Sequence, residues 1–149
     1  MPTFEIQNGE ILPNLTFEVT RETIRAFGEA SLDLNPLHFD DNYMSGSFGK
    51  TRFDGVIAHG MTGFALITRL LTEWLEPRQG IHRRLETRWF RPVKPGDVLN
   101  VQARIAQIIE KPGGRWVVFD IEINNQRDET VAKGEAMAEI PAATASRIL

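Results

Sequence analysis

The stretch that decides the fold is residues 60–77, which read GMTGFALITRLLTEWLEP. Between the opening glycine and Pro77, apolar side chains fall on most sides of a helix with about 100° between successive residues. These side chains are Met61, Phe64, Ala65, Leu66, Ile67, Leu70, Leu71, Trp74 and Leu75. A helix that is apolar nearly all round is typical of a protein core, and the proline ends it. The rest of the chain must therefore surround this helix.

The second half of the chain supplies strands that can do so. Apolar and polar residues alternate over 99–105 and over 117–123, as expected for half-buried antiparallel strands. Another strand, over 81–90, comes before the Pro95-Gly96-Asp97 turn, and a last strand covers 130–140. One face of the last strand carries only small residues, which would let a helix approach the sheet closely. They are Ala132, Gly134, Ala136 and Ala138.

The first part of the chain predicts helical structure ahead of the central helix. Residues 15–20 alternate weakly, as a short strand does, and Thr20 stands at the N-cap of a helix. Pro36 disfavours helical geometry at the residue before it, so 33–38 should form a turn or loop. Residues 41–48 suit a short polar helix, which their glycine weakens.

These elements predict an α+β fold in a single domain over residues 1–149. A curved antiparallel β-sheet is expected to wrap around the long central apolar helix, with a helical insertion before it. The composition agrees, because 42% hydrophobic and 25% charged residues are close to the globular average. The longest apolar stretch is far shorter than the roughly 20 residues of a membrane span, so no membrane association is expected.

Charge and cysteine content exclude several classes of function. The formal net charge of -3 argues against a dedicated nucleic-acid binder. The chain has no cysteine, which excludes thiolate nucleophiles, disulfide scaffolds and cysteine-ligated metal centres. The N-terminus shows no basic segment leading into an apolar one, so we expect a cytoplasmic protein.

A carboxylate, an amide and an imidazole share one short loop, at Asp33, Asn35 and His38. Because Pro36 fixes a turn, Asp33 and His38 can point at a common spot, which a helix would prevent. Such a pair can hold a water molecule and move its protons, each group contributing about 10²- to 10⁴-fold in rate. In the alternative interpretation, Asp33 or Asn35 caps backbone amides and His38 is a surface residue. Taken alone, these residues favour the alternative.

A second cluster, FDGVIAHGM at 53–61, leads directly into the central helix. The first N–H groups of a helix have no intrahelical partner and lie at the positive end of its dipole. Gly60 and its neighbours could therefore bind a developing oxyanion. In the alternative, Gly60 only provides a tight turn and His59 forms a local hydrogen bond, and this too is favoured for the cluster alone.

Together, the two clusters resemble the MaoC-like, (R)-specific enoyl-CoA hydratases of the hot-dog superfamily, over nearly the whole chain. DLNPLHFD at 33–40 is similar to the family's signature of Asp, Asn-Pro and His. HGM at 59–61 resembles its triplet at the head of the central helix, and FRPVKPGD at 90–97 resembles its Pro-Val-x-Pro-Gly-Asp turn. Leu32 stands where the family usually has glycine, and Asp41 where it often has proline.

The resemblance implies the hydration of trans-2-enoyl-CoA to (R)-3-hydroxyacyl-CoA, or the reverse dehydration. It implies that Asp33 and His38 position and activate the water, and that Asn35 orients this dyad. The backbone N–H of Gly60 would receive the thioester oxygen and stabilise the enolate charge that forms as water adds to C3. His59 then braces the turn at Gly60 rather than acting as an acid or base.

Coenzyme A would need a cationic site for its phosphates. The stretch 78–94 holds six basic residues against one glutamate, and we expect Arg84 and Arg88 to bind the phosphates. Equally, Arg84, Glu86 and Arg88 could pair on a solvated outer strand face. No cofactor is expected, since coenzyme A is part of the substrate. No metal is expected either, because the histidines lack the compact spacing of a helix-borne zinc site.

Two other functions fit parts of the same pattern. A hot-dog acyl-CoA thioesterase would direct water at the thioester carbonyl instead of the double bond and would release free thiol. A non-catalytic acyl-CoA or lipid-binding module has no need of Asp33, Asn35 and His38, which argues against it. Hot-dog domains of this family usually pair through sheet edges, so the resemblance implies a homodimer.

Overall fold

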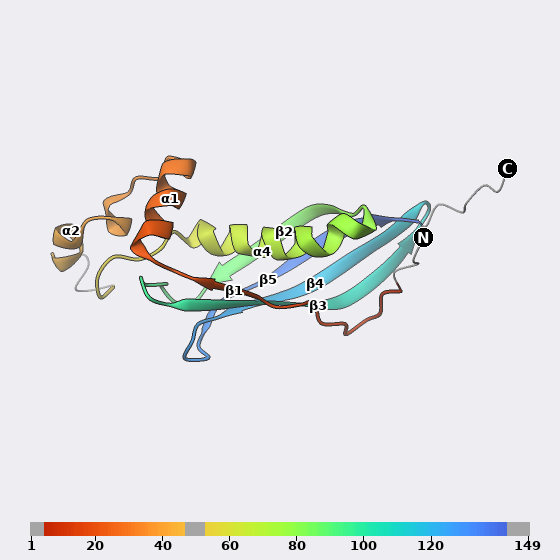
Figure 1. Cartoon of the computed structure of the whole chain (residues 1–149). Coiled ribbons are helices and arrows are strands. Elements are labelled where there is room, and N and C mark those ends of the chain that lie inside the picture. Colours follow the sequence, from red (N-terminus) through yellow and green to blue (C-terminus); the bar gives the residue numbers. More distant parts are fainter. Residues whose placement is uncertain (1–4, 47–52, 143–149) are drawn as a thin grey trace.

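The computed structural model describes residues 5–46 and 53–142. Its centre is a five-stranded antiparallel sheet in the order β1-β3-β4-β5-β2, curled around one long helix, α4 (Figure 1). The strands are β1 (Leu15–Glu18), β2 (Ile81–Trp89), β3 (Val98–Lys111), β4 (Gly114–Asn124) and β5 (Thr130–Pro141), and α4 spans Gly60–Leu75. The predicted α+β class and the hot-dog arrangement of a sheet around a helix are confirmed.

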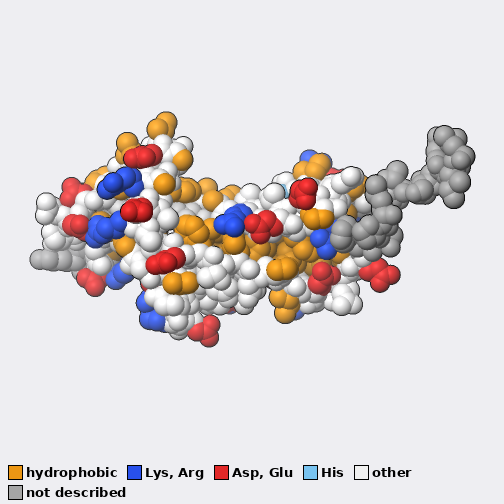
Figure 2. Space-filling view, viewed as in Figure 1, with side chains coloured by type: hydrophobic (Ala, Val, Ile, Leu, Met, Phe, Trp, Pro, Cys, Tyr) orange, Lys and Arg blue, Asp and Glu red, His pale blue; other side chains and the backbone are white. Residues whose placement is uncertain are grey.

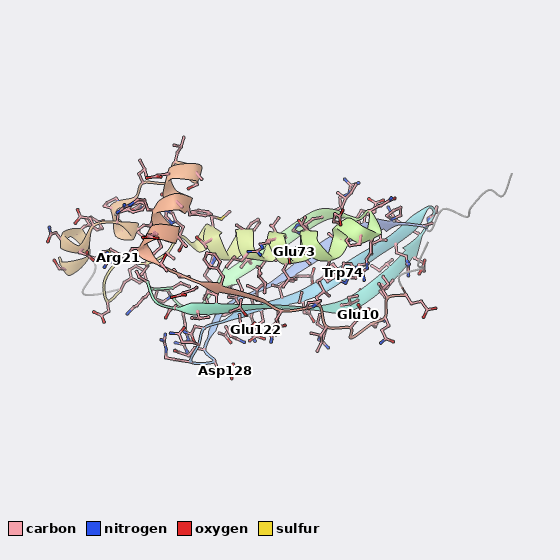
Figure 3. The ribbon with its side chains drawn as sticks, in the orientation of Figure 1. Glu10, Arg21, Glu73, Trp74, Glu122 and Asp128 are labelled. Carbon is pink, nitrogen blue, oxygen red and sulfur yellow. The ribbon has the colours of Figure 1, made fainter. Side chains whose placement is uncertain are left out.

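Helix α4 lies along the concave face of the sheet and buries its inner side there (Figure 1). Ile67 is fully buried, and the ring of Trp74 packs edge-on against Phe119 of β4 with centroids 5.3 Å apart. In Figure 3, Trp74 lies on the side of α4 that faces the sheet. The sequence predicts that α4 is buried on nearly all sides, but its outer side is partly open, with Met61 49% exposed. Within the described residues, the sheet thus covers one side of α4 and leaves the other open around Met61.

In the described part of the chain before Gly60, two shorter α-helices lie beyond the N-terminal end of α4 (Figure 1). Thr20 is the N-cap of helix α1 (Arg21–Ser31), and its side-chain oxygen accepts a hydrogen bond from the Thr23 N–H at 3.1 Å, as predicted. Helix α2 (Asp41–Ser45) covers part of the predicted 41–48, whose last two residues lie outside the described chain. The helical insertion is therefore confirmed. No helix among the described residues is long and apolar enough to cross a bilayer.

The small residues of β5 serve two different purposes. Ala132, Ala136 and Ala138 are buried in the core that β5 shares with α4. Gly134 is needed elsewhere, because a Cβ atom at this position would overlap the backbone carbonyl oxygen of Glu86 on the neighbouring strand β2. The prediction that this whole face makes room for the helix is therefore wrong at Gly134, which makes room for β2.

Replacing Gly134 with alanine should destabilise the protein, because the added methyl group must push β2 away from β5. We expect the free energy of unfolding to fall by about 2 kcal/mol or more, as for a severe overpacking substitution. Lys133→Ala, on the same strand with a side chain 57% exposed, should change it by about 0.5 kcal/mol or less. Urea unfolding followed by circular dichroism measures both, and equal effects would contradict this role of Gly134.

Candidate active site

Hydrogen bonds bring the sequence motifs together at the N-terminal end of α4. The segment before α4 touches the dyad loop, defined as residues 33–39, through the Ile57 N–H, which donates to the Leu37 carbonyl at 3.2 Å. The N–H of the next residue donates to the Val93 carbonyl in the turn after β2, at 2.7 Å. His59 Nε2 lies 2.9 Å from the carbonyl oxygen of Asp33. This segment therefore lies between the dyad loop and the turn and holds both.

The dyad loop packs on helix α1 through Gly28. A Cβ atom at Gly28 would overlap the ring of Phe39, so glycine is required for this ring to lie directly on the helix. Helix α1 is followed by Leu32, whose φ of 60° is the left-handed conformation that favours glycine. The chain thus enters the loop through a strained leucine immediately before Asp33.

Asp33 and His38 lie side by side, as their spacing around Pro36 predicted. His38 Nε2 lies 3.9 Å from Asp33 Oδ2, with the His38 side chain 8% exposed and that of Asp33 51% exposed. His38 Nδ1 lies 2.7 Å from the carbonyl oxygen of Ile57. Because a carbonyl only accepts hydrogen bonds, Nδ1 carries the ring proton of the neutral imidazole and Nε2 keeps its lone pair. The pair therefore offers two acceptors to a molecule that reaches both.

Burial lowers the pKa of His38 below its usual value near 6.5, because it disfavours the charged ring, and the neighbouring His59 acts in the same direction. The hydrogen bond to Ile57 and the charge of Asp33 raise this pKa and offset part of the shift. His38 is consequently neutral at pH 7. Its contribution to stability is present above about pH 6.5 and is lost as the pH falls through the lower folded pKa, since the unfolded chain binds the proton more readily.

Asn35 shapes the dyad loop through both its side chain and its backbone. Its Oδ1 accepts a hydrogen bond from the Leu37 N–H at 3.1 Å and so caps the 3-10 helix η1 (Pro36–His38). Its backbone N–H donates to Asp33 Oδ1 at 3.3 Å. The capping alternative is thus correct for both Asp33 and Asn35, whereas His38 is buried rather than a surface residue. The orienting role of Asn35 in a reaction stays a prediction.

His59 packs against His38, with ring centroids 3.7 Å apart and ring planes 24° apart. It is 3% exposed and binds the backbone of the dyad loop, which fits the predicted bracing role. One ligand atom each of Asp33, His38 and His59 lies within 4.8 Å of the others, a spacing that a metal ion could bridge. Stacked imidazoles direct their in-plane lone pairs side by side rather than at one point, so this cluster suits a metal poorly.

Gly60, the predicted oxyanion donor, begins α4 beside an apolar pocket of about 310 Å³. As the first helical residue it has an N–H without an intrahelical acceptor. Trp89 covers it, because the indole N–H donates to the Gly60 carbonyl at 3.0 Å and a Cβ atom at Gly60 would lie 3.2 Å from the indole. His59 lines this pocket, whereas Asp33 and His38 do not. The pocket and the pair therefore adjoin through the His59 ring.

Three contributors to the site escape the sequence analysis. The carbonyl of Ile57 is a backbone group, and its role cannot be predicted from the identity of a side chain. Trp89 has the sequence pattern of an ordinary aromatic residue at the end of a strand. Of the three, only Gly28 could have been found from the sequence. A glycine inside a helix lowers the stability of the helix by about 1 kcal/mol relative to alanine, so its presence there suggests a packing or functional role. That role is the close approach of Phe39.

The arginines predicted to bind coenzyme A lie on the exposed face of β2, outside the residues that line this pocket. Arg84 forms ion pairs of 2.9 Å with Glu86 and with Glu135 of β5. Arg88 is exposed and forms no ion pair within residues 5–46 and 53–142. The pairing of Arg84 corresponds to the alternative interpretation of this strand face. Coenzyme A binding by Arg84 and Arg88 stays a prediction.

Known proteins resemble this chain in sequence and in fold. The family model described as MaoC like domain matches residues 6–122. The chain is 29% identical over 125 residues to a 3-hydroxybutyryl-CoA dehydratase of Methylorubrum extorquens, covering 83% of this chain and 74% of that one. It is 26% identical over 129 residues to an (R)-specific enoyl-CoA hydratase of Rhodospirillum rubrum, covering 87% and 85%. The unliganded R-hydratase of Pseudomonas aeruginosa matches with a TM-score of 0.79 and 28% identity, over 93% of this chain and 84% of that one.

The charge of Asp33 should be visible in the titration of His38. Asp33→Asn removes a carboxylate that raises the pKa of His38, so the NMR titration midpoint of this ring should move to lower pH. Asp120→Asn, at a carboxylate of similar exposure on β4, should leave the midpoint unchanged. An unchanged or higher midpoint in Asp33→Asn would show that the two groups do not interact.

Proposed function

The chain belongs to the MaoC-like domain family, and on that premise we propose that it hydrates trans-2-enoyl-CoA to (R)-3-hydroxyacyl-CoA or catalyses the reverse dehydration. The observation that carries the proposal is the pairing of His38 Nε2, which keeps its lone pair, with Asp33 Oδ2 at 3.9 Å. The activities in the names of the relatives are of this type. The proposed substrate is an acyl-CoA thioester.

We propose that a single water molecule bridges these two acceptors. If the water oxygen lies about 2.8 Å from His38 Nε2 and from Asp33 Oδ2, the angle between these two directions at the water oxygen is about 90°. This is near the angle between the two O–H bonds of water. Both O–H bonds would then point at the pair, and a lone pair of the water would be free to attack C3. This geometry supports the roles proposed for Asp33 and His38.

The proton balance follows from the hydrogen bonds of the pair. The proton of His38 is on Nδ1 and is committed to Ile57, and the Asp33 carboxylate has none to give. The proton that C2 receives must therefore come from the water itself. The water oxygen bonds to C3, one O–H bond breaks towards the pair, and this proton is passed to C2 as the enolate collapses. Dehydration follows the same steps in reverse.

The negative charge that builds up on the thioester oxygen needs a fixed donor. The N–H of Gly60 lies at the positive end of the α4 dipole and is the donor that we propose. Trp89 holds the carbonyl of the same residue and so helps to fix the turn. The reaction as proposed needs no cofactor, because coenzyme A is part of the substrate.

Asp33→Asn and His38→Gln should each lower kcat by about 10²- to 10⁴-fold, because each removes one of the two groups that bind the water. The double variant should be only slightly worse than the poorer single variant, since both residues act on one water. Loss of the conjugated thioester absorbance of crotonyl-CoA measures the rate. Asp120→Asn and His82→Gln, on strands β4 and β2, should keep the parental rate.

The same assay distinguishes the competing activity. A thioesterase would release free coenzyme A thiol as the absorbance is lost, whereas a hydratase releases none. Chiral analysis of the product should give the (R)-3-hydroxyacyl-CoA. Hydration at near-parental rates by well-folded Asp33→Asn and His38→Gln proteins would refute the assignment of this pair.

We further propose that the active form is a homodimer. Strand β2 is at one edge of the sheet, and large apolar side chains near it and on α4 are exposed. They are Met61 (49%), Ile81 (51%), Trp89 (48%) and Phe90 (53%). Figure 2 shows apolar side chains in a band along the α4 side of the molecule. Pairing of two copies would cover both the strand edge and apolar surface, which are otherwise aggregation hazards.

Light scattering should accordingly give a mass of twice the 16.9 kDa of one chain. Ile81→Lys places a charge at the start of the edge strand β2 and should weaken the association, because the charge would be buried between the copies. Lys111→Arg at the far end of β3 keeps its charge and should not change the mass. A parental mass of one chain at working concentration would overturn the dimer.

A further inference from the structure

The apolar pocket beside Gly60 lies under the first turn of α4. Its helix side is formed by Gly60 and Gly63, and its inner walls come from the three central strands of the sheet. These wall residues are Leu99, Ile123, Val131 and Ala132, none more than 3% exposed. Among the described residues that line the pocket, Arg91 is the only arginine or lysine, and none is an aspartate or glutamate. Arg91 Nε lies 3.5 Å from Glu129 Oε2. The interior therefore suits an uncharged aliphatic group.

The pocket is kept open by the absence of a side chain at position 63. A Cβ atom on Gly63 would lie 3.2 Å from Ile123 Cδ1, which is closer than ordinary van der Waals contact. Ile123 is fully buried and has little freedom to move away. One methyl group at position 63 would thus narrow the space between α4 and β4.

Gly60 is the only group proposed for the reaction that lines this pocket, and Asp33 and His38 adjoin it through the His59 ring. His59 also lines the pocket, and its ring stacks on that of His38 at 3.7 Å. A thioester whose oxygen binds the Gly60 N–H has its C1 beside Gly60, so the carbons beyond C3 can continue into the pocket. A volume of about 310 Å³ is several times the roughly 30 Å³ share of one water molecule, so the pocket has room for several methylene groups.

We propose, on the basis of the function proposed above, that this pocket receives the acyl chain and that the contact between Gly63 and Ile123 sets its maximum length. The substrates are short to medium unbranched enoyl thioesters, since several methylene groups beyond C3 fit in this volume. Gly63 and Ile123 determine specificity and take no part in the chemistry.

The test is the dependence of kcat/KM on chain length in Gly63→Ala, with trans-2-enoyl-CoA of four, six, eight and ten carbons. Alanine favours the helix more than glycine, so the variant should fold, and its melting temperature checks this. The ratio of kcat/KM for the eight-carbon to the four-carbon substrate should fall about 10-fold or more, because a pocket discriminates about 10- to 200-fold per methylene. An equal loss for every chain length would overturn the proposal.

A second substitution tests the contact itself. Ile123→Val removes Cδ1, the atom that a methyl group at position 63 would meet, so the double variant should recover most of the lost preference for eight carbons. Ile121→Val removes the same group two residues earlier on β4, from a buried side chain that does not line the pocket. Combined with Gly63→Ala it should restore nothing. Equal rescue by both valines would overturn the role of Ile123.

Binding without turnover separates this proposal from the function on which it rests. Isothermal titration calorimetry with saturated butanoyl-CoA and octanoyl-CoA should show tighter binding of the longer chain to the parent, and Gly63→Ala should reduce that preference about 10-fold or more. If the binding preference behaves in this way but no enoyl-CoA is hydrated, the proposed hydratase function is refuted and the acyl-chain pocket is still supported. If hydration occurs but neither measurement depends on position 63, the pocket assignment fails and the function stands.

Discussion

The backbone of Ile57 makes the contacts on which the geometry of the site depends. Its N–H donates to the Leu37 carbonyl, and its carbonyl accepts the proton of His38 Nδ1 at 2.7 Å. Because both bonds come from the backbone of one residue, they fix the dyad loop and the imidazole ring relative to each other and to the start of α4. Without the second bond the ring could take either tautomer, and its lone pair would have no fixed direction towards Asp33.

Local patterns account for the parts of the fold and site that the sequence predicts. Alternation over two long segments gives β3 and β4, because successive side chains of a strand point to opposite faces. Thr20 caps α1 as predicted. Asp33 and His38 come together because Pro36 keeps their short spacing out of a helix, and the structure needs no distant contact to place both on one loop.

Contacts between segments far apart in the chain account for the rest. Arg84 binds Glu135, a residue 51 positions later, because β2 and β5 pair at the edge of the sheet. The same pairing explains why Gly134 meets Glu86 instead of the helix. The open outer side of α4 depends on how far the sheet curls, and residue periodicity carries no information about this. Periodicity identifies an apolar surface but does not say whether the same chain covers it.

Leu32 has a consequence for motion. A glycine at a left-handed helix end can leave that conformation easily and can act as a hinge, whereas leucine has a narrow left-handed well and few alternatives near it. The side chain is 81% exposed, so the surrounding packing does not explain its conformation, and the strain is borne by the backbone at the end of α1. Helix α1 and the loop that carries Asp33 should therefore move as one stiff body, and any opening of this site for entry or release must come from displacement of that body as a whole.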